Sequence, residues 1–385
     1  MQKPFIKVLF IAHYPELYGS IRSLLDLVNG LENSGISPFF YLPKEGCLSK
    51  TLELKDIEYV TMPVPQWVSN RHFPIKKKIA VFLKVNNTVE KVRKLIRDWR
   101  IDLVYTNTYV TPIGLIAANS EGIPHVWHIR EFGELDFSLN FVFPKWISRG
   151  LIRSSQAIIC NSQAVRMHHF KAWSNAKLHV IYNGVATQNQ FDQLATRNHL
   201  RPQNDIFTFL IIGSISPKKG QETAIKALAE LIKKGQRARL IIAGSGRDEY
   251  VDHCHSLAVN LAVSAHVEFT GFILDPYEVY DKADCLLMCS ENEAFGRVTA
   301  EAMSACLPVI GRNSGGTPEV IVDGETGVLY NTFDELVDAM IKLLENPALA
   351  RSMGQVGWQR ARQLFNIEDY AAGVHQVIQK VVGKR

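Results

Sequence analysis

Short runs of β-branched and aromatic residues alternate with amphipathic stretches along the whole chain. In the first half this pattern predicts strands at 5–12, 37–42, 57–61, 102–106, 124–129, 156–160 and 178–182, with helices at 20–33, 76–98 and 162–172. In the second half it predicts strands at 206–213, 238–243, 266–270, 284–289 and 307–310, with helices at 220–234, 247–261, 296–305 and 333–345. Strands separated by helices indicate parallel sheets that helices cover on both faces.

The length of 385 residues is more than one hydrophobic core usually organises, and predicts two or three domains. A polar, weakly periodic stretch at 187–204 interrupts the alternation, and we interpret it as a linker. We therefore predict an α/β protein with two Rossmann-like doubly wound domains that face a central cleft. They span 1–186 and 205–365, and a final helix at 366–385 returns to the N-terminal domain. Ligands of such sheets bind outside the carboxyl ends of the strands, so the cleft is the expected site.

The composition is that of an ordinary soluble globular protein, with 46% hydrophobic and 21% charged residues. No apolar run approaches the roughly 18–20 residues that span a bilayer. The apolar stretch at 5–12 contains Lys7 and has no cleavage pattern after it, so we interpret it as a buried strand rather than a signal peptide. Six scattered cysteines without a CxxC pair favour a reduced, cytoplasmic compartment.

The positive charge is concentrated in residues 66–100. Ten Lys or Arg residues stand there against Glu90 and Asp98, so this segment is strongly basic while the rest of the chain is slightly acidic. From Pro74 onward, apolar residues and lysines mix as in an amphipathic helix. One interpretation is a solvated helix packed on the first sheet. The other is docking to an anionic membrane surface, which would place the protein peripherally on the inner face. The sequence contains no recognised nucleic-acid-binding module, so we expect no nucleic acid partner.

The segment 290–329 carries the most informative chemistry. Glu293, Phe295 and Gly296 follow a predicted strand, and Glu301 lies in the helix that comes next. Eight helical residues separate two carboxylates by about 12 Å along the axis, so Glu293 and Glu301 would grip separate hydroxyl-bearing parts of one elongated ligand. Main-chain N–H groups around Phe295, Gly296 and Arg297 lie where that helix begins, and they form a candidate diphosphate cradle.

This segment resembles the signature of glycosyltransferase family 4, the group 1 glycosyltransferases, which have the GT-B fold. The pattern E-x-F-G-x(4)-E-A-M is followed by L-P-V-I, G-G-x-x-E and D-G-x-T-G, and it is matched here from Glu293 to Gly327. The resemblance implies that Glu293 binds hydroxyls of the donor sugar and Glu301 those of the ribose. It also implies that the backbone from Ala294 to Gly296 contacts the sugar or the diphosphate.

A second motif, GSISPKKG at 213–220, lies between a buried strand and a helix. A lysine at this place neutralises the leaving diphosphate, where charge develops during sugar transfer. The family usually has G-R-x-x-x-x-K-G, so Lys219 matches the lysine and Ser214 replaces the arginine. Serine supplies no charge, and we predict that Arg297 compensates, with a surface role as the alternative. We interpret Lys218 as a solvated neighbour.

Weaker signals complete the expected site. Phe272 follows a predicted strand that in the family often lies beside the nucleotide base, and Gly19 matches a glycine of the loop after the first strand. The resemblance implies that His128 lies by the reacting sugar. Arg130 and Glu131, just beyond it, are the candidates for acceptor binding.

The resemblance implies a retaining, metal-independent hexosyltransferase without a cofactor. Lys219 and helix dipoles would replace a divalent ion, and the leaving phosphate oxygen would take the acceptor's proton by front-face attack. Glu293, His128 and Lys219 are the expected catalytic residues. We expect a UDP-glucose-type donor first and GDP-mannose second, with a saccharide or polyprenyl-lipid-linked acceptor in polysaccharide or glycoconjugate biosynthesis. An NAD-linked epimerase, a phosphorylase and a catalytically weakened nucleotide-sugar-binding protein are the alternatives.

Overall fold

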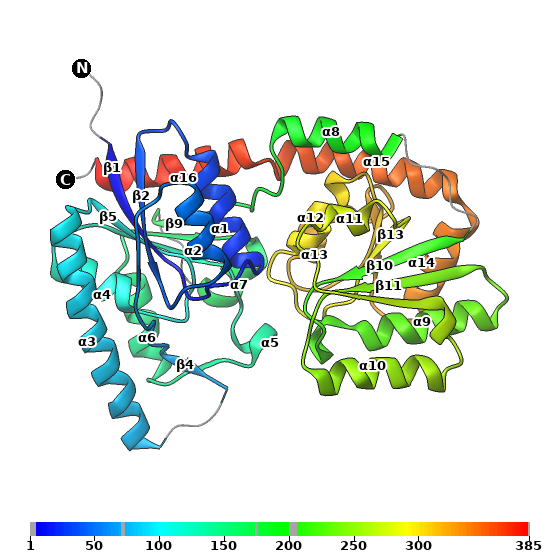
Figure 1. Cartoon of the computed structure of the whole chain (residues 1–385), viewed down its shortest axis with the longest axis horizontal. Helices are drawn as coiled ribbons and strands as arrows, with labels where there is room; N and C mark the ends of the chain where they lie inside the picture. The colour runs from blue at the N-terminus through cyan, green and yellow to red at the C-terminus, as the bar shows by residue number, and fades with distance from the viewer. Residues whose placement is uncertain (1–4, 71–73, 172, 174–175, 200–205, 384–385) are drawn as a thin grey trace. The chain divides into compact units, whose positions relative to one another are not determined.

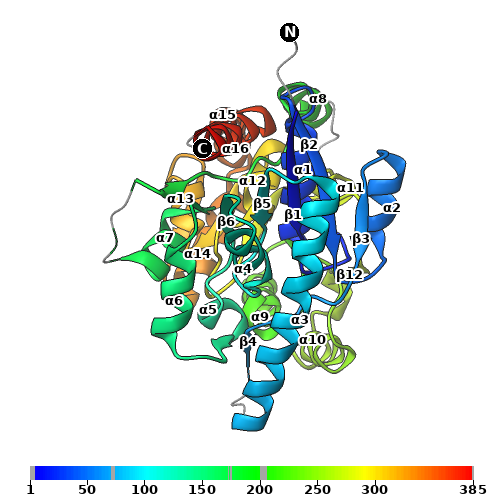
Figure 2. The same cartoon turned by 90° about the vertical axis from the view of Figure 1, so that its left-hand side faces the viewer.

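The computed structural model describes residues 5–70, 74–171, 173, 176–199 and 206–383. The chain divides into two units, which we call unit 1, Met1–Gly184 with Ile367–Arg385, and unit 2, Val185–Asn366. Each unit is a parallel sheet with helices on both faces (Figures 1 and 2). The expected mixed α/β class with two Rossmann-like domains is confirmed.

Unit 1 is built on a seven-stranded sheet of order β3-β2-β1-β5-β6-β8-β9. Its strands are β1 (Ile6–Ile11), β2 (Ile36–Leu42), β3 (Tyr59–Thr61), β5 (Leu103–Thr106), β6 (His125–Ile129), β8 (Ala157–Cys160) and β9 (Leu178–Val180). Its helices are α1 (Gly19–Gly30), α2 (Cys47–Leu54), α3 (Ile75–Trp99), α4 (Ile113–Ser120), α5 (Glu134–Phe137), α6 (Lys145–Arg153), α7 (Gln163–Phe170) and α16 (Ile367–Val382). A separate antiparallel pair joins β4 (Val68–Ser69) and β7 (Asn140–Phe141).

Alternate residues of the central strands feed two hydrophobic cores in unit 1, as expected for strands buried on both faces. Val8 and Phe10 pack with α1, α2 and α16 on one face. Leu9 and Ile11 pack with α3 and α4 on the other face. Successive side chains of a strand point to opposite faces, so a continuous apolar run serves both cores.

Unit 2 is built on a six-stranded sheet of order β12-β11-β10-β13-β14-β15. Its strands are β10 (Phe207–Ile212), β11 (Ala238–Ala243), β12 (Val267–Gly271), β13 (Cys285–Met288), β14 (Val309–Arg312) and β15 (Gly327–Tyr330). Its helices are α8 (Gln188–His199), α9 (Gln221–Lys233), α10 (Asp248–Asn260), α11 (Tyr277–Tyr280), α12 (Arg297–Ser304), α13 (Thr317–Val320), α14 (Phe333–Glu345) and α15 (Pro347–Leu364), with 3-10 turns η1 (Pro217–Lys219) and η2 (Ser264–His266).

The strand order reverses direction between β10 and β13 in unit 2 and between β1 and β5 in unit 1. At such a switch point the loops at the carboxyl ends of two neighbouring strands run to opposite faces and leave a crevice. Lys219 follows β10 and Glu293 follows β13. The two motifs found in the sequence therefore lie at the switch point of unit 2.

The stretch expected as a linker, 187–204, differs from the prediction. Residues 188–199 form α8, which belongs to unit 2 and buries Phe191 and Leu194; residues 200–204 lie outside the described residues. The helix contacts α12 and α15, which lie far along the chain. The polar local sequence alone therefore did not indicate a helix that packs on unit 2.

The C-terminal helix α16 packs on α1 within unit 1. Gly30 makes this contact close, because a Cβ atom there would lie 2.6 Å from the Cβ of Ala371. Residues 384–385, the end of the expected final helix, lie outside the described residues.

Candidate active site

The loop between β13 and α12 places the two carboxylates of the main motif. Gly296 caps α12 with φ 85°, a left-handed conformation that favours glycine. Phe295 is buried against the ring of Phe365, with 5.5 Å between ring centroids, so its side chain anchors the loop. Backbone contacts hold the other side of the loop, where the N–H of Gly316 donates to the Glu293 carbonyl at 2.7 Å. The sequence motif is thus a rigid turn into a helix.

Lys219 and Glu293, separated by 74 residues in sequence, form an ion pair. The Lys219 Nζ lies 2.7 Å from Oε2 of Glu293. Gly220 makes the approach of η1 to β13 possible, since a Cβ atom there would lie 2.5 Å from the Cys289 carbonyl oxygen. Partly exposed ion pairs contribute about 0–1 kcal/mol, so an anionic ligand can displace the carboxylate from the lysine at low cost. The expected phosphate-binding and sugar-binding groups are therefore adjacent.

Glu301 is almost fully buried on α12, and both of its carboxylate oxygens are engaged. Arg297 Nε donates to Oε1 at 2.6 Å, and the Tyr280 hydroxyl donates to Oε2 at 3.1 Å. Burial, followed by the charge of Glu301, holds the pKa of Tyr280 well above its usual value, so the hydroxyl keeps its proton. Each carboxylate oxygen has a second lone pair, so Glu301 can still accept from a ligand hydroxyl.

Arg297 and Tyr280 both contact Glu301, and neither contact was predicted from the sequence. Arg297 was predicted to compensate for the missing phosphate arginine, but the structure pairs its guanidinium with Glu301. Tyr280 was not predicted at all. It lies in the short helix α11, 21 residues before its partner Glu301. Only the folded chain brings them together.

Ser214 and Phe272 follow β10 and β12. Ser214 is exposed, and its carbonyl accepts from the Gln221 side chain at 3.1 Å. Phe272 is 58% exposed directly after β12. Ala294 is buried in the loop before α12. All three lie in the loops at the carboxyl edge of the sheet of unit 2, the edge that carries Lys219 and Glu293.

In unit 1, His128 lies on β6 with its imidazole fully buried. Its Nδ1 is hydrogen-bonded to the Tyr105 hydroxyl, while its Nε2 has no partner among the described residues. Burial, with the charge of Arg130 as a smaller cause, holds the pKa of His128 well below its usual value, so the ring is neutral. A buried polar nitrogen without a partner costs about 1–3 kcal/mol. Such an atom is retained where a ligand or a water can satisfy it.

Arg130 and Glu131, the expected acceptor residues, are buried and engaged within the protein. The Arg130 guanidinium donates to Asn107 Oδ1 at 2.7 Å, to the Tyr370 hydroxyl at 2.6 Å and to Asn183 Oδ1. These bonds join the ends of β5 and β6 to residue 183 and to α16. The arrangement favours a structural role for Arg130 over contact with an acceptor.

The Glu131 carboxylate accepts from the backbone N–H of Tyr109 at 2.9 Å, from that of Arg130 at 3.0 Å and from the Thr108 hydroxyl. Burial raises the pKa of Glu131 to about 7. Gly19, by contrast, is the first residue of α1 and has open space around it.

Within the described part of the chain, no group of three or more His, Cys, Asp or Glu side chains is placed to hold a metal ion. Cys285 and Cys289 are buried and free.

Two family models match consecutive parts of the chain. The model described as Glycosyltransferase Family 4 matches residues 19–189, and the one described as Glycosyl transferases group 1 matches residues 192–360. Together they cover most of unit 1 and nearly all of unit 2.

Curated relatives align over most of the chain at moderate identity. The α-monoglucosyldiacylglycerol synthase of Acholeplasma laidlawii is 25% identical over 370 residues, which are 89% of each chain. The GDP-mannose-dependent α-(1-6)-phosphatidylinositol monomannoside mannosyltransferase of Mycobacterium tuberculosis is 27% identical over 77% of this chain and 83% of that protein. Among solved structures, Anabaena HepE in complex with UDP and glucose superposes with a TM-score of 0.77 at 22% identity, covering 97% of this chain and 99% of that one.

Proposed function

The chain belongs to glycosyltransferase family 4, the group 1 glycosyltransferases of GT-B fold, and on that premise we propose that it transfers a hexose from UDP-glucose to a lipid-linked or saccharide acceptor. The observation that carries this proposal is the pairing of Lys219 with Glu293 at 2.7 Å, in the loops beside the helix that bears Glu301. The pair offers a cation to a diphosphate and a carboxylate to sugar hydroxyls. The Glu301 carboxylate offers acceptors to a ribose.

In the proposed reaction the bond between the anomeric carbon and the leaving phosphate oxygen breaks as the acceptor oxygen attacks from the same face. Lys219 and the positive end of α12 stabilise the charge that develops on the diphosphate. The leaving oxygen takes the acceptor's proton, so no side chain has to act as a strong base. Glu293 then positions the sugar. NMR of the product linkage tests this mechanism, because an inverted anomeric configuration would exclude it.

We propose that His128 also serves this reaction. The unpartnered Nε2 supports it, since a neutral imidazole can donate to or accept from a sugar hydroxyl. His128→Ala should lower kcat for transfer while UDP binding, which the residues of unit 2 provide, stays unchanged. Loss of UDP affinity and activity together would point to a folding defect instead.

The donor is tested by thermal-shift screening against UDP-, GDP- and ADP-sugars. A ligand at 100 times its Kd stabilises by about 2.7 kcal/mol, so the preferred donor should raise the melting temperature clearly. We expect UDP-glucose to give the larger shift, and a larger shift with GDP-mannose would change the donor but not the reaction class. Binding of a labelled donor without transfer or hydrolysis would favour the weakened binding protein.

A lipid acceptor is supported by the relatives, because the names of the synthase and of the mannosyltransferase both describe glycolipids. It is also supported by the surface of α3. The first turns of this helix reach past the other elements of unit 1 (Figures 1 and 2). They expose Ile75, Ile79, Phe82 and Leu83 among Lys76, Lys77, Lys78 and Lys84. We call this set the α3 surface. Residues 71–73 of the basic segment lie outside the described residues.

A second set of exposed aromatic side chains, on α5 and α6, flanks β7 in unit 1. Trp146 on α6 is 76% exposed and Phe137 at the end of α5 is 61% exposed, with Lys145 and Arg149 close in sequence. Tryptophan beside cations is typical of membrane interfaces. We propose that this cluster and the α3 surface dock on an anionic leaflet. Failure to sediment with anionic liposomes at low salt would exclude the docking.

No helix in the described ranges is long and apolar enough to cross a membrane.

A further inference from the structure

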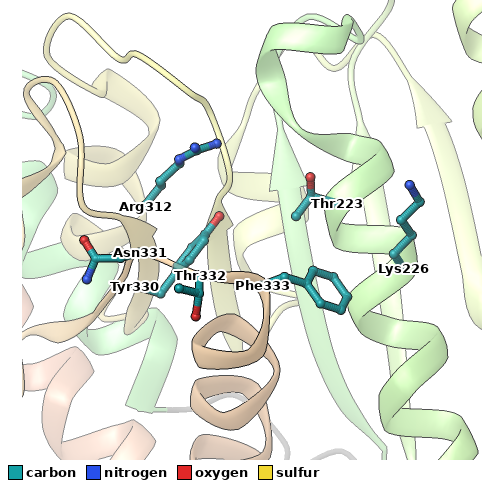
Figure 3. A pocket seen from close by; sticks show the side chains of 7 residues that line it. All are labelled: Thr223, Lys226, Arg312, Tyr330, Asn331, Thr332 and Phe333. Carbon is teal, nitrogen blue, oxygen red and sulfur yellow. The ribbon is translucent and has the colours of Figure 1, made fainter.

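We propose that unit 2 carries a second anion-binding site, apart from the donor site, that takes a phosphate group between α9 and the ends of β14 and β15. A cavity of about 390 Å³ lies there (Figure 3). It is lined by residues of α9, of the last positions of β14 and β15, and of the start of α14, namely Thr223, Lys226, Arg312, Tyr330, Asn331, Thr332 and Phe333. Two of the seven are cations and none is acidic.

Arg312 is the centre of this site, which we call the Arg312 site. Its side chain is partly buried, yet among the described residues none forms a hydrogen bond or an ion pair with its guanidinium. Lys226, in contrast, is bonded to Glu222 at 2.7 Å. The guanidinium is a planar fork of N–H donors that matches two oxygens of a phosphate. The positive charge of Arg312 has no counter-charge in the cavity, so the cavity is suited to bind an anion.

Further groups converge on the same space. Figure 3 shows the Arg312 guanidinium and the Tyr330 hydroxyl on one side of the cavity and Thr223 of α9 on the other, with the ring of Phe333 below Thr223. The Thr223 hydroxyl can donate to a phosphate oxygen, and Lys226 lies at the rim. The site thus combines a fixed charge, a hydroxyl donor and an apolar wall.

The remaining lining residues are occupied within the protein. The Thr332 hydroxyl accepts from the Glu335 N–H at 3.2 Å, and the Asn331 oxygen accepts from Asn313 at 3.2 Å. The nearby Glu335 carboxylate accepts from the Asn331 N–H at 2.6 Å and from the N–H of Thr332, the N-cap residue of α14, at 3.4 Å. These bonds hold the wall of the cavity in place. Arg312 and Thr223 remain as the groups that can bind a phosphate.

The cavity is larger than a phosphate ion. Its volume falls in the range of about 300–1,000 Å³ found for small-molecule pockets, and Phe333 is 39% exposed. A phosphate monoester could therefore place its phosphate on Arg312 and its organic part along Phe333. We assign the site to phosphate groups, and the test separates the free ion from esters.

The Arg312 site shares no lining residue with the proposed donor site, so it does not depend on the proposed function. The Arg312 site and the donor site are nevertheless connected by the backbone, because residues 313–316 follow Arg312 directly. The Ser314 hydroxyl donates to the Glu291 carbonyl at 2.7 Å, and the Gly316 N–H donates to the Glu293 carbonyl at 2.7 Å. The segment that begins at Arg312 thus holds the loop of Glu293.

The test uses the full chain saturated with the nucleoside diphosphate that stabilises it most, so that the donor site is filled. Inorganic phosphate, glycerol 3-phosphate and glucose 6-phosphate are then titrated in by isothermal calorimetry, at constant ionic strength set with sodium chloride. We expect saturable binding of at least one of the three. Arg312→Gln should weaken it at least tenfold. Arg351→Gln, which removes the same charge from an exposed position on α15, should leave it unchanged.

Three outcomes would overturn the proposal. They are absence of saturable binding to the wild type, undiminished binding to Arg312→Gln, and an equal loss in Arg351→Gln. Thr223→Val is a second variant that keeps the net charge and should also weaken phosphate binding. Melting temperatures without phosphate show whether each variant is folded. The affinity for the nucleoside diphosphate, measured separately, shows whether the donor proposal stands.

Discussion

Glu301 is held in place by contacts that the sequence motif does not show. A carboxylate free to rotate would bind a ribose weakly, because its ordering would cost conformational entropy on binding. Arg297 on one oxygen and Tyr280 on the other hold it in one orientation. We therefore regard Arg297 and Tyr280 as positioning residues for the proposed ribose contact.

Tyr280→Phe should raise KM for the donor about tenfold, because one hydrogen bond to a charged group is lost, with a smaller effect on kcat. Arg297→Ala should lower transfer far more than Lys218→Ala, which removes a charge from the neighbouring loop. Steady-state kinetics on purified variants measures both. Equal effects of Arg297→Ala and Lys218→Ala would show that Arg297 has no special role.

Ser214 stands where the family pattern has an arginine, and restoring the arginine tests the effect of this difference. It is exposed, so a longer side chain fits without repacking. Ser214→Arg should raise kcat/KM several-fold, because an added cation near a developing diphosphate charge stabilises the transition state. Ser256→Arg adds the same charge at an exposed position on α10 and should change nothing. If both variants behave alike, phosphate neutralisation does not limit the reaction.

At the scale of elements, α3 divides into two halves with different surroundings. The second half buries Val85, Val89, Val92 and Ile96 in the core of unit 1, while the first half exposes its apolar side chains. Exposed apolar residues that continue a helix beyond its core contact are costly unless something covers them. The division supports docking through the α3 surface.

The double change Phe82→Ser and Leu83→Ser should reduce binding to anionic liposomes by about tenfold while leaving the unfolding transition nearly unchanged, since both side chains are more than half exposed. Leu54→Ser, at a position 90% exposed on α2, is the matched apolar control and should bind as the wild type does. Liposome sedimentation at low salt measures both. Equal loss in the control would mean that general hydrophobicity, not this surface, drives binding.

At the scale of the whole molecule, the stability of unit 1 should depend on pH. Burial lowers the pKa of His13 and of His125 to about 3 and that of His169 to about 4. The unfolded chain takes up these protons near pH 6.5 and the folded chain does not. The contribution of these neutral histidines to the free energy of unfolding is therefore complete above pH 6.5 and is lost as the pH falls toward 4.

His125 allows a test, because its two ring nitrogens are bonded to Thr106 and Ser155 away from the proposed sites. His125→Asn should flatten the slope of unfolding free energy between pH 6.0 and 4.5 by up to about 1.4 kcal/mol per pH unit. Urea unfolding followed by circular dichroism measures it. His199→Asn, at an exposed position on α8, should keep the wild-type slope; an unchanged slope in His125→Asn would contradict the assignment.

The class of fold and the family could both be predicted from the amino-acid sequence. Its alternation of apolar strands and amphipathic helices reflects local physics, in which each strand must be buried on two faces. The ordered motif from Glu293 to Gly327 depends on a single loop and helix, so its residues could be read in order. Lys219 and Glu293 were both predicted as donor-site residues, each in a motif that follows a strand, but their ion pair was not predicted.

The contacts of each polar side chain, in contrast, depend on how the chain folds in three dimensions. The sequence did not indicate partners for Arg130 and Glu131, yet residues 107 and 108 after β5, residue 183 and α16 form hydrogen bonds with them. Tyr280 and α8 were missed for the same reason, since their partners lie far along the chain. Hydrogen bonds and packing join residues by proximity in space, and that proximity is set by how whole sheets and helices assemble.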